Sequence, residues 1–346
     1  MNIPVRYFAV AAGLVLTGLF FTALAQPDES LDLGTVLELA ADADNSVHEA
    51  RKALGDAERD LLLLEADPQA LPLDRADAER SVAAAADRVR LAELEAELEA
   101  AKAYTDLLEA RASLSQAEQQ LEITELSLNG TRTRYEAGAA AELAVIEAEN
   151  AVTEAESSYR EAVADLGFAA DDLAVRTGLA VSGSTVLEPL TEEALPGSPD
   201  EAAASERLME LSGSLRDAER AVSAAADNYA ATDNELSSRN EIEAARTGLA
   251  DAEAAWERAL TTAETALGQS LSSLTANENR YRNALAALDV AAANLEAQRA
   301  RYEAGSISRL ALLEQEAGYA GTEATAASAL HSLFIAQLQL EVTILQ

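Results

Sequence analysis

The sequence of 346 residues contains no cysteine, little proline, few aromatic residues and few basic ones. Without cysteine the chain has no disulfide framework and no thiolate chemistry. Aromatic residues make up only 4% of the chain, and Trp256 is the single tryptophan. The apolar residues are mostly alanine and leucine, which are strong helix formers. Such a composition does not fill a thick globular core, and it favours slim, closely packed long helices or coiled coils.

Basic residues are too few to balance the acidic ones. The chain has 25 Lys and Arg against 61 Asp and Glu, so the net charge is −36. Phosphate groups would be repelled, which argues against nucleic acid and anionic lipid as partners. Most of the carboxylates are expected to lie on solvated helix faces. A basic ligand or a basic partner surface stays open as an alternative.

Groups typical of catalytic sites are scarce as well. His48 and His331 are the only histidines, and they stand in unrelated sequence contexts. A catalytic metal site usually needs several His, Cys or carboxylate ligands at defined spacing. The sequence also has no glycine-rich phosphate loop after a strand and no nucleophile elbow. We therefore expect no enzyme activity, no metal and no cofactor.

The N-terminus has the pattern of a signal peptide at 1–25. Arg6 precedes an apolar run from about residue 8 to 24, and Ala23-Leu-Ala25 meets the small-x-small cleavage rule. An uncleaved membrane anchor is the alternative, since the run is just long enough to span a bilayer. No other segment is expected to be a transmembrane helix. The rest of the chain is therefore predicted to be exported to the cell envelope, in the outer membrane or the periplasm.

Proline positions indicate where long helices can run, because proline breaks a helix interior. Beyond the signal region, 73–188 and 200–346 are free of it, since the prolines are Pro27, Pro68, Pro72, Pro189, Pro196 and Pro199. We expect a loop at 66–73 and a longer linker with several glycines near 177–200. The chain is thus divided into a first helical repeat, a linker and a second helical repeat, at 26–178, 179–203 and 204–346.

The two halves share an internal repeat. Arg134-Tyr-Glu-Ala-Gly138 in the first half recurs as Arg301-Tyr-Glu-Ala-Gly305 in the second. At the same spacing, the match continues through the pairs Leu143/Leu310, Ala144/Ala311, Glu147/Glu314 and Glu149/Glu316. A five-residue identity inside a longer match indicates tandem structural units.

Leucine or tyrosine recurs every seventh residue before each copy of the motif. These positions are Leu107, Leu114, Leu121, Leu128 and Tyr135, and then Leu267, Leu274, Tyr281, Leu288, Leu295 and Tyr302. Heptad spacing is typical of coiled coils. Gly138 and Gly305 follow, and a new helical pattern begins a few residues later. Since glycine allows the left-handed conformation of a helix end, each motif is predicted to be the tip of an antiparallel hairpin. A helix over 74–137 would be nearly 100 Å long, at roughly 1.5 Å per residue.

The repeated motif and the Leu-x-x-(Ile/Leu)-Glu-x-Glu run after it resemble the TolC-like outer-membrane efflux protein family. The opening stretch from Leu31 to Ala41 is also similar to the mature N-terminus of that family, and the resemblance covers about 31–178 and 205–345. It implies an all-α fold of long antiparallel coiled-coil hairpins in two tandem repeats. The transmembrane strand pairs of that family are expected near 60–80 and 225–245. Neither place has alternating, aromatic-flanked segments, so we expect a reduced or absent β-barrel.

The resemblance further implies a homotrimer whose hairpins form a periplasmic tunnel. Its tips would meet a periplasmic adaptor and an inner-membrane pump, and the candidate docking residues are Arg134, Tyr135, Gly138, Arg301, Tyr302 and Gly305. Family members usually carry an acidic residue six positions after the tip glycine, but this chain has Ala144 and Ala311 there. An acidic ring at the tunnel entrance is therefore not expected for this chain, although the resemblance alone would imply one.

From the residues alone, each tip arginine has two interpretations. It either opposes the dipole at its helix C-terminus or contacts an acidic partner. Likewise the tip tyrosines are either seam residues or docking residues. For the whole chain, the first functional hypothesis is an efflux component that forms a helical export conduit. The alternative is a structural coiled-coil spacer or scaffold of the envelope without transport, and a periplasmic adaptor is a weaker third hypothesis.

Overall fold

The computed structural model describes residues 30–195, 197 and 199–346. The predicted signal peptide at 1–25 lies outside the described residues. Within them the chain is helical and contains no β-strand, apart from one isolated bridge between Leu31 and Leu187. The sequence-based prediction of an all-α fold with long hairpins is therefore confirmed. The places near 60–80 and 225–245, where strands would be expected from the resemblance, hold helix ends joined by short turns at 67–71 and 233–238.

The helices form two sets of four that repeat along the chain. The first set is α1 (Leu33–Ala43), α2 (Asn45–Ala66), α3 (Pro72–Glu136) and α4 (Glu142–Thr177). The second set is α5 (Glu201–Leu211), α6 (Gly213–Thr232), α7 (Arg239–Glu303) and α8 (Arg309–Leu345), after a short 3₁₀ turn at Glu192–Ala194. Corresponding helices begin at the spacing that separates the two tip motifs, to within one residue, so the repeat extends through every α-helix. The second set begins at Glu201, three residues before the start that the sequence suggested.

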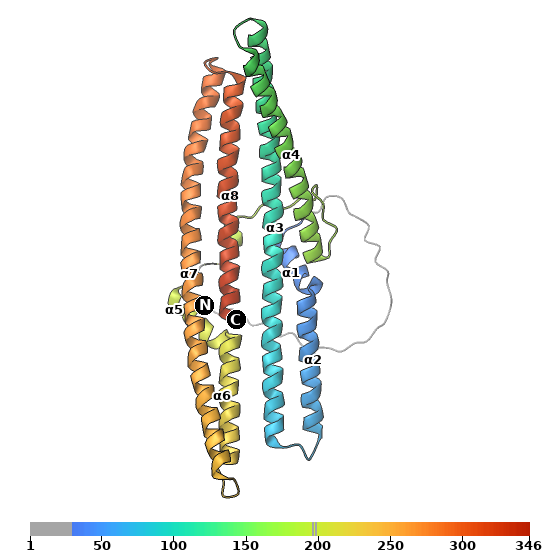
Figure 1. The fold of residues 1–346 in the computed structure, drawn as a ribbon, viewed down its shortest axis with the longest axis vertical. Coiled ribbons are helices and arrows are strands. Elements are labelled where there is room, and N and C mark those ends of the chain that lie inside the picture. Colours follow the sequence, from blue (N-terminus) through green and yellow to red (C-terminus); the bar gives the residue numbers. More distant parts are fainter. Residues whose placement is uncertain (1–29, 196, 198) are drawn as a thin grey trace, which may run out of the picture.

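Each set is built around one helix of 65 residues. Helices α2 and α4 follow each other along the side of α3, and α6 and α8 do the same along α7 (Figure 1). The two sets meet where α3 packs against α8. In the upper part of Figure 1 the helices thus lie in the order α7, α8, α3, α4, and α4 and α7 form the two edges.

The ends of the long helices follow from local sequence. Helix α3 begins with Pro72 at its first position, where the missing amide hydrogen has no partner to lose. Helix α7 begins at a capping box in which Ser238 and Glu241 each accept a backbone N–H of the other. The observed bounds of α3 differ from the predicted 74–137 by one or two residues.

Small residues let the helices approach closely in the middle of the molecule. Ala100, Ala101 and Ala103 on α3 are at most 2% exposed. Several heptad leucines fill the hairpin seams, namely Leu107, Leu128, Leu267, Leu274 and Leu295. Alanine and leucine together thus make the thin core that the composition indicated.

Among the described residues, α8 alone is long and apolar enough to span a membrane by length and composition. The expectation that no segment beyond the signal region reaches this level is therefore wrong for α8. In the folded chain, 56% of its most apolar window is buried, against α3 and α7. The apolar character of α8 thus reflects its position between the two sets of helices.

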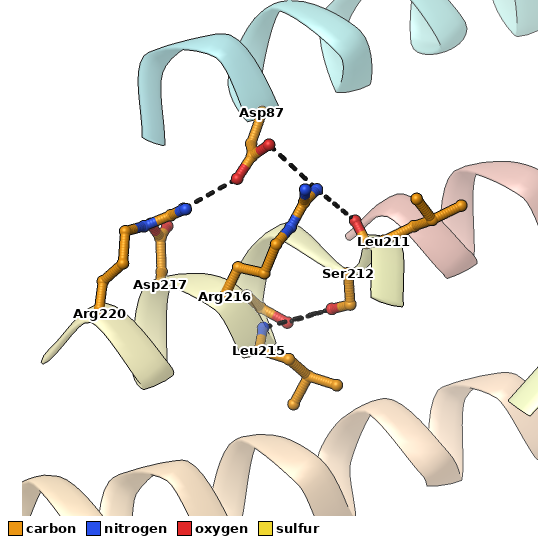
Figure 2. Close-up of polar contacts among 8 residues, drawn as sticks. Asp87, Leu211, Ser212, Leu215, Arg216, Asp217 and Arg220 are labelled. Atoms are coloured by element: carbon orange, nitrogen blue, oxygen red, sulfur yellow. Dashed lines mark hydrogen bonds and ion pairs between the residues drawn. The ribbon is translucent and has the colours of Figure 1, made fainter. Parts of the chain in front are cut away.

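An ion-pair cluster joins the lower halves of the two sets, where α3 meets α6 (Figure 2). The Asp87 carboxylate on α3 contacts the guanidinium groups of Arg216 and Arg220 on α6, at 3.0 and 2.9 Å. Arg216 also donates to the Leu211 carbonyl at the end of α5. We call Asp87, Arg216 and Arg220 the arginine clamp. Its side chains are 10 to 24% exposed, so solvent screens them less than ordinary surface pairs.

Candidate docking site at the two hairpin tips

The first tip closes α3 with a left-handed glycine. Gly138 has φ 72°, and its N–H donates to the Tyr135 carbonyl at 2.8 Å. The next N–H, from Ala139, donates to the Arg134 carbonyl at 2.8 Å. These two bonds form a Schellman motif, which satisfies carbonyl groups that a helix end leaves without partners.

The second tip repeats this geometry. Gly305 has φ 70° and donates to the Tyr302 carbonyl at 2.8 Å, and Ser306 donates to the Arg301 carbonyl at 2.9 Å. Both tips lie at the same end of the molecule (Figure 1). The fold therefore brings the two copies of the motif, which are far apart in the sequence, to one end of the helix array.

The tip arginines differ in their contacts. The Arg134 guanidinium donates to the Gly130 carbonyl and the Thr131 hydroxyl, both one turn back on its own helix. This contact agrees with the interpretation that Arg134 supports the end of α3. Arg301 has no side-chain bond of this kind among the described residues, and its side chain is exposed. Arg301 is thus the freer cation for a contact with a partner.

The tip tyrosines are partly open to solvent. Tyr135 is 44% exposed and Tyr302 is 39% exposed, although both continue the heptad rows of their helices. On the first tip, two apolar side chains at the start of α4 are also exposed, Leu143 at 63% and Ile146 at 47%. The first tip therefore presents an apolar surface that the sequence did not single out as exposed.

Ion pairs cross between the two arms just below each tip. Arg132 on α3 contacts Glu149 on α4 at 2.8 Å. At the corresponding place in the second repeat, Arg299 on α7 contacts Glu316 on α8 at 3.4 Å. The repeated glutamates are visible in the sequence, but their pairing with the arginines is not. The signal in the sequence would have been an arginine before each predicted tip and a glutamate after it at the same two spacings in both repeats, because antiparallel arms bring such positions together.

The return helices begin differently in the two repeats. Ser308 caps α8 by accepting the Ala311 N–H at 3.1 Å, whereas Ala141 at the start of α4 offers no side-chain cap. Serine at this position typically stabilises a helix by about 1 kcal/mol relative to alanine. The second tip is thus the more firmly held of the two, and the first tip is the more apolar.

A group of polar side chains lies far from the tips, where α3 packs on α8. His331 is 6% exposed, and its Nδ1 lies 3.0 Å from a carboxylate oxygen of Glu109. The hydrogen bond from His331 lowers the pKa of Glu109, while burial raises the pKa of Asp106 nearby. His331 is thus a buried residue of the seam between α3 and α8.

Tyr104 holds together the segment before α1 and the segment after α4. Its hydroxyl donates within 3.0 Å of the carbonyls of Leu31 and Glu188, and the side chain is 1% exposed. Burial raises the pKa of Tyr104 to about 12, so the hydroxyl keeps its proton and its donor role. This role could not be predicted from the sequence, because the partners are backbone groups 73 and 84 residues away.

Within the described part of the chain, no group of three or more His, Cys, Asp or Glu residues is arranged to hold a metal ion. The arrangement at the tips offers hydrogen-bond donors, an exposed arginine and exposed tyrosines. These groups suit contact with another protein surface and supply no acid, base or nucleophile in a pocket.

The fold is that of TolC-like outer-membrane channels, which the resemblance of the tip motif anticipated. A membrane protein from Pseudomonas aeruginosa superposes with a TM-score of 0.65 at 17% identity, over 90% of each chain. The CmeC outer membrane channel of Campylobacter jejuni gives 0.64 at 13% identity, over 90% of this chain and 85% of that one. The open-state MtrE outer membrane channel of Neisseria gonorrhoeae gives 0.61 at 15%, over 90% and 88%.

No protein-family model and no curated protein sequence matches the chain. The likeness therefore lies in the fold and not in the sequence as a whole. The structural neighbours are channels and not enzymes.

Proposed function

We propose that this protein is an efflux component of the cell envelope that forms a helical export conduit. In this proposal three copies close a tube, and the hairpin tips meet a periplasmic adaptor and an inner-membrane pump. The chain acts as a passive path and turns over no substrate. The shared fold with outer-membrane channels supports the proposal, and the observation that carries it is the unclosed helix array with two complementary edges.

One edge of the array, α4, presents large apolar side chains. The buried side of α4 faces α3, yet a second row on the opposite side is open to solvent. It consists of Leu143 at 63%, Ile146 at 47%, Phe168 at 72% and Val175 at 76% exposed. Isolated surface leucines need no explanation, but a row along one helix face indicates a partner.

The other edge, α7, presents mostly small side chains, with the larger Val290 among them at 62% exposed. Opposite its heptad leucines run two exposed rows with seven-residue spacing, Ala276, Asn283, Val290 and Ala297, and Asn279, Ala286, Ala293 and Ala300. Large residues from one helix pack between small ones of a neighbour in close helix packing. The α4 edge of one copy therefore fits the α7 edge of the next. Such a head-to-tail contact closes into a ring when the rotation between copies closes.

The experiment is the oligomeric state of the full chain, measured by native mass spectrometry, with the cross-section of the particle by electron microscopy. We expect a trimer with an open axial lumen and all six tips at one end. Replacing two residues of the large row, Phe168→Glu with Val175→Glu, is expected to shift the trimer to monomer. Each change would leave a carboxylate facing an apolar neighbour.

The matched control is Val163→Glu. Val163 is also an exposed apolar residue of α4, at 44%, but lies well away from the large row around the helix. This variant is expected to stay trimeric. A compact particle without a lumen, or a monomer in the unmodified chain, would refute the conduit and favour the coiled-coil spacer.

A further inference from the structure

A groove in the second repeat combines apolar side chains with several carboxylates, and a helical conduit does not need this combination. It lies between α6 and α7 beside the end of α5 and has a volume of about 500 Å³. Its apolar lining is Met209, Leu215, Val222 and Trp256, and its polar lining is Glu219, Glu253, Glu257 and Arg216. The volume lies in the range of small-molecule sites, and the single tryptophan of the chain stands in its wall.

The carboxylates of this groove are not neutralised by the protein. Glu219, Glu253 and Glu257 are exposed, and no ion pair involves them among the described residues. The cations close in sequence are engaged elsewhere. Arg216 and Arg220 bind Asp87, and the Arg258 Nε donates to a backbone carbonyl of its own helix.

Figure 2 shows the directions of two residues that line the groove, Arg216 and Leu215. Arg216 points toward Asp87 on α3, and Leu215, the next residue back, points in the opposite direction, toward α7. Leu215 is only 3% exposed and forms part of the buried floor. The positive charge of Arg216 is thus held at Asp87, so the groove keeps an apolar floor with unpaired negative charge around it.

The first repeat provides an internal comparison. When the two sets of helices are aligned end to end, Glu219 corresponds to Arg51, Glu257 to Arg90 and Glu253 to Ala86. Trp256 corresponds to Val89 and Met209 to Ala41. The hairpin architecture therefore accepts basic and small residues at these places. The aromatic ring with three carboxylates is particular to the second repeat and is not needed to build the fold.

We propose that this groove binds an amphipathic organic cation. The apolar body of the ligand packs on Trp256, Met209 and Leu215, and its cationic centre lies near the three carboxylates. A cation over an indole face is attracted by the ring quadrupole, and tryptophan is the strongest partner of this kind. Fixed negative charge adds to this attraction and rejects anions of the same shape. The site stands independently of the conduit proposal, because it lies within one chain.

The position of Trp256 makes the test direct, since all tryptophan fluorescence of the chain comes from the groove. The full-length protein is titrated in 150 mM salt with tetraphenylphosphonium, and separately with tetraphenylborate, which has nearly the same shape and the opposite charge. We expect saturable quenching or a spectral shift with tetraphenylphosphonium only. Equal responses to the two ions would overturn the proposal.

A charge variant separates the groove from the general acidity of the chain. Glu253→Gln with Glu257→Gln is expected to raise the dissociation constant of tetraphenylphosphonium by about tenfold or more. The control, Glu296→Gln with Glu303→Gln, removes the same charge from the far end of α7 and is expected to leave it within about twofold. Circular dichroism checks that both variants are folded.

Two further results would refute the site. An unchanged dissociation constant in the groove variant would assign the binding to the surface charge of −36. Binding by the dilute chain that disappears on assembly would show that the groove is a contact between copies. Trp256→Ala is also expected to weaken the binding of tetraphenylphosphonium. Because this variant has no tryptophan fluorescence, its binding is measured by calorimetry.

Discussion

Gly138 and Gly305 carry the turn of each tip in a conformation that other residues rarely adopt. Their φ values are 72° and 70°, and a methyl group added at either position would meet no atom within 4 Å. The strain in Gly138→Ala is therefore purely in the backbone. We expect this variant to lower the free energy of unfolding by about 1–2 kcal/mol, measured by urea denaturation with circular dichroism.

Gly130, eight residues earlier in α3, is the matched control. It also has open space around it but lies in the helix interior at an ordinary φ. There alanine removes backbone entropy from the unfolded chain and is expected to stabilise by about 0.5–1 kcal/mol. If both variants changed stability in the same direction, the left-handed geometry would not control the tip.

These glycines also show what sequence alone can predict. The five-residue repeat and the heptad rows placed the hairpins and the tips to within two residues, because both signals are local and periodic. The arginine clamp could not be predicted, since Asp87 and Arg220 are 133 residues apart and nothing in the pattern pairs them. The groove at Trp256 needs three helices to meet, and its sequence signal is only an unusual residue. The docking role of the tip residues stays a prediction.

The arginine clamp holds α6 against α3. The Asp87 side chain is 10% exposed and faces two arginines. Its removal leaves the partly buried Arg216 without any carboxylate, while Arg220 keeps only Asp217 on its own helix. Asp87→Ala is therefore expected to lower the free energy of unfolding by about 3 kcal/mol.

Asp77→Ala is the control for this prediction, measured in the same urea denaturation. Asp77 pairs with Arg80 on its own helix and is 59% exposed, and Arg80 keeps a second partner in Asp227. A change below about 0.5 kcal/mol is expected there. A loss at Asp87 as small as that at Asp77 would show that apolar packing alone holds α6 in place.

Together, the two sets of helices form a thin array with little interior. Most long charged side chains therefore lie on its surface, and 61 acidic groups face only 25 basic ones. The ion pairs that cross between helices do not offset this excess, because most of them join exposed partners and stabilise little. The array is held by alanine and leucine seams against the mutual repulsion of its carboxylates.

This balance predicts that salt stabilises the protein. Raising NaCl from 10 to 300 mM shortens the screening length from about 30 Å to well under 10 Å, which weakens repulsion between distant carboxylates more than close contacts. We expect the melting temperature, followed by circular dichroism, to rise by several degrees. Sorbitol at matched osmolality controls for solute exclusion and is expected to have a smaller effect. A melting temperature that falls with NaCl would mean that the ion pairs between helices, and not the apolar seams, dominate the stability of the array.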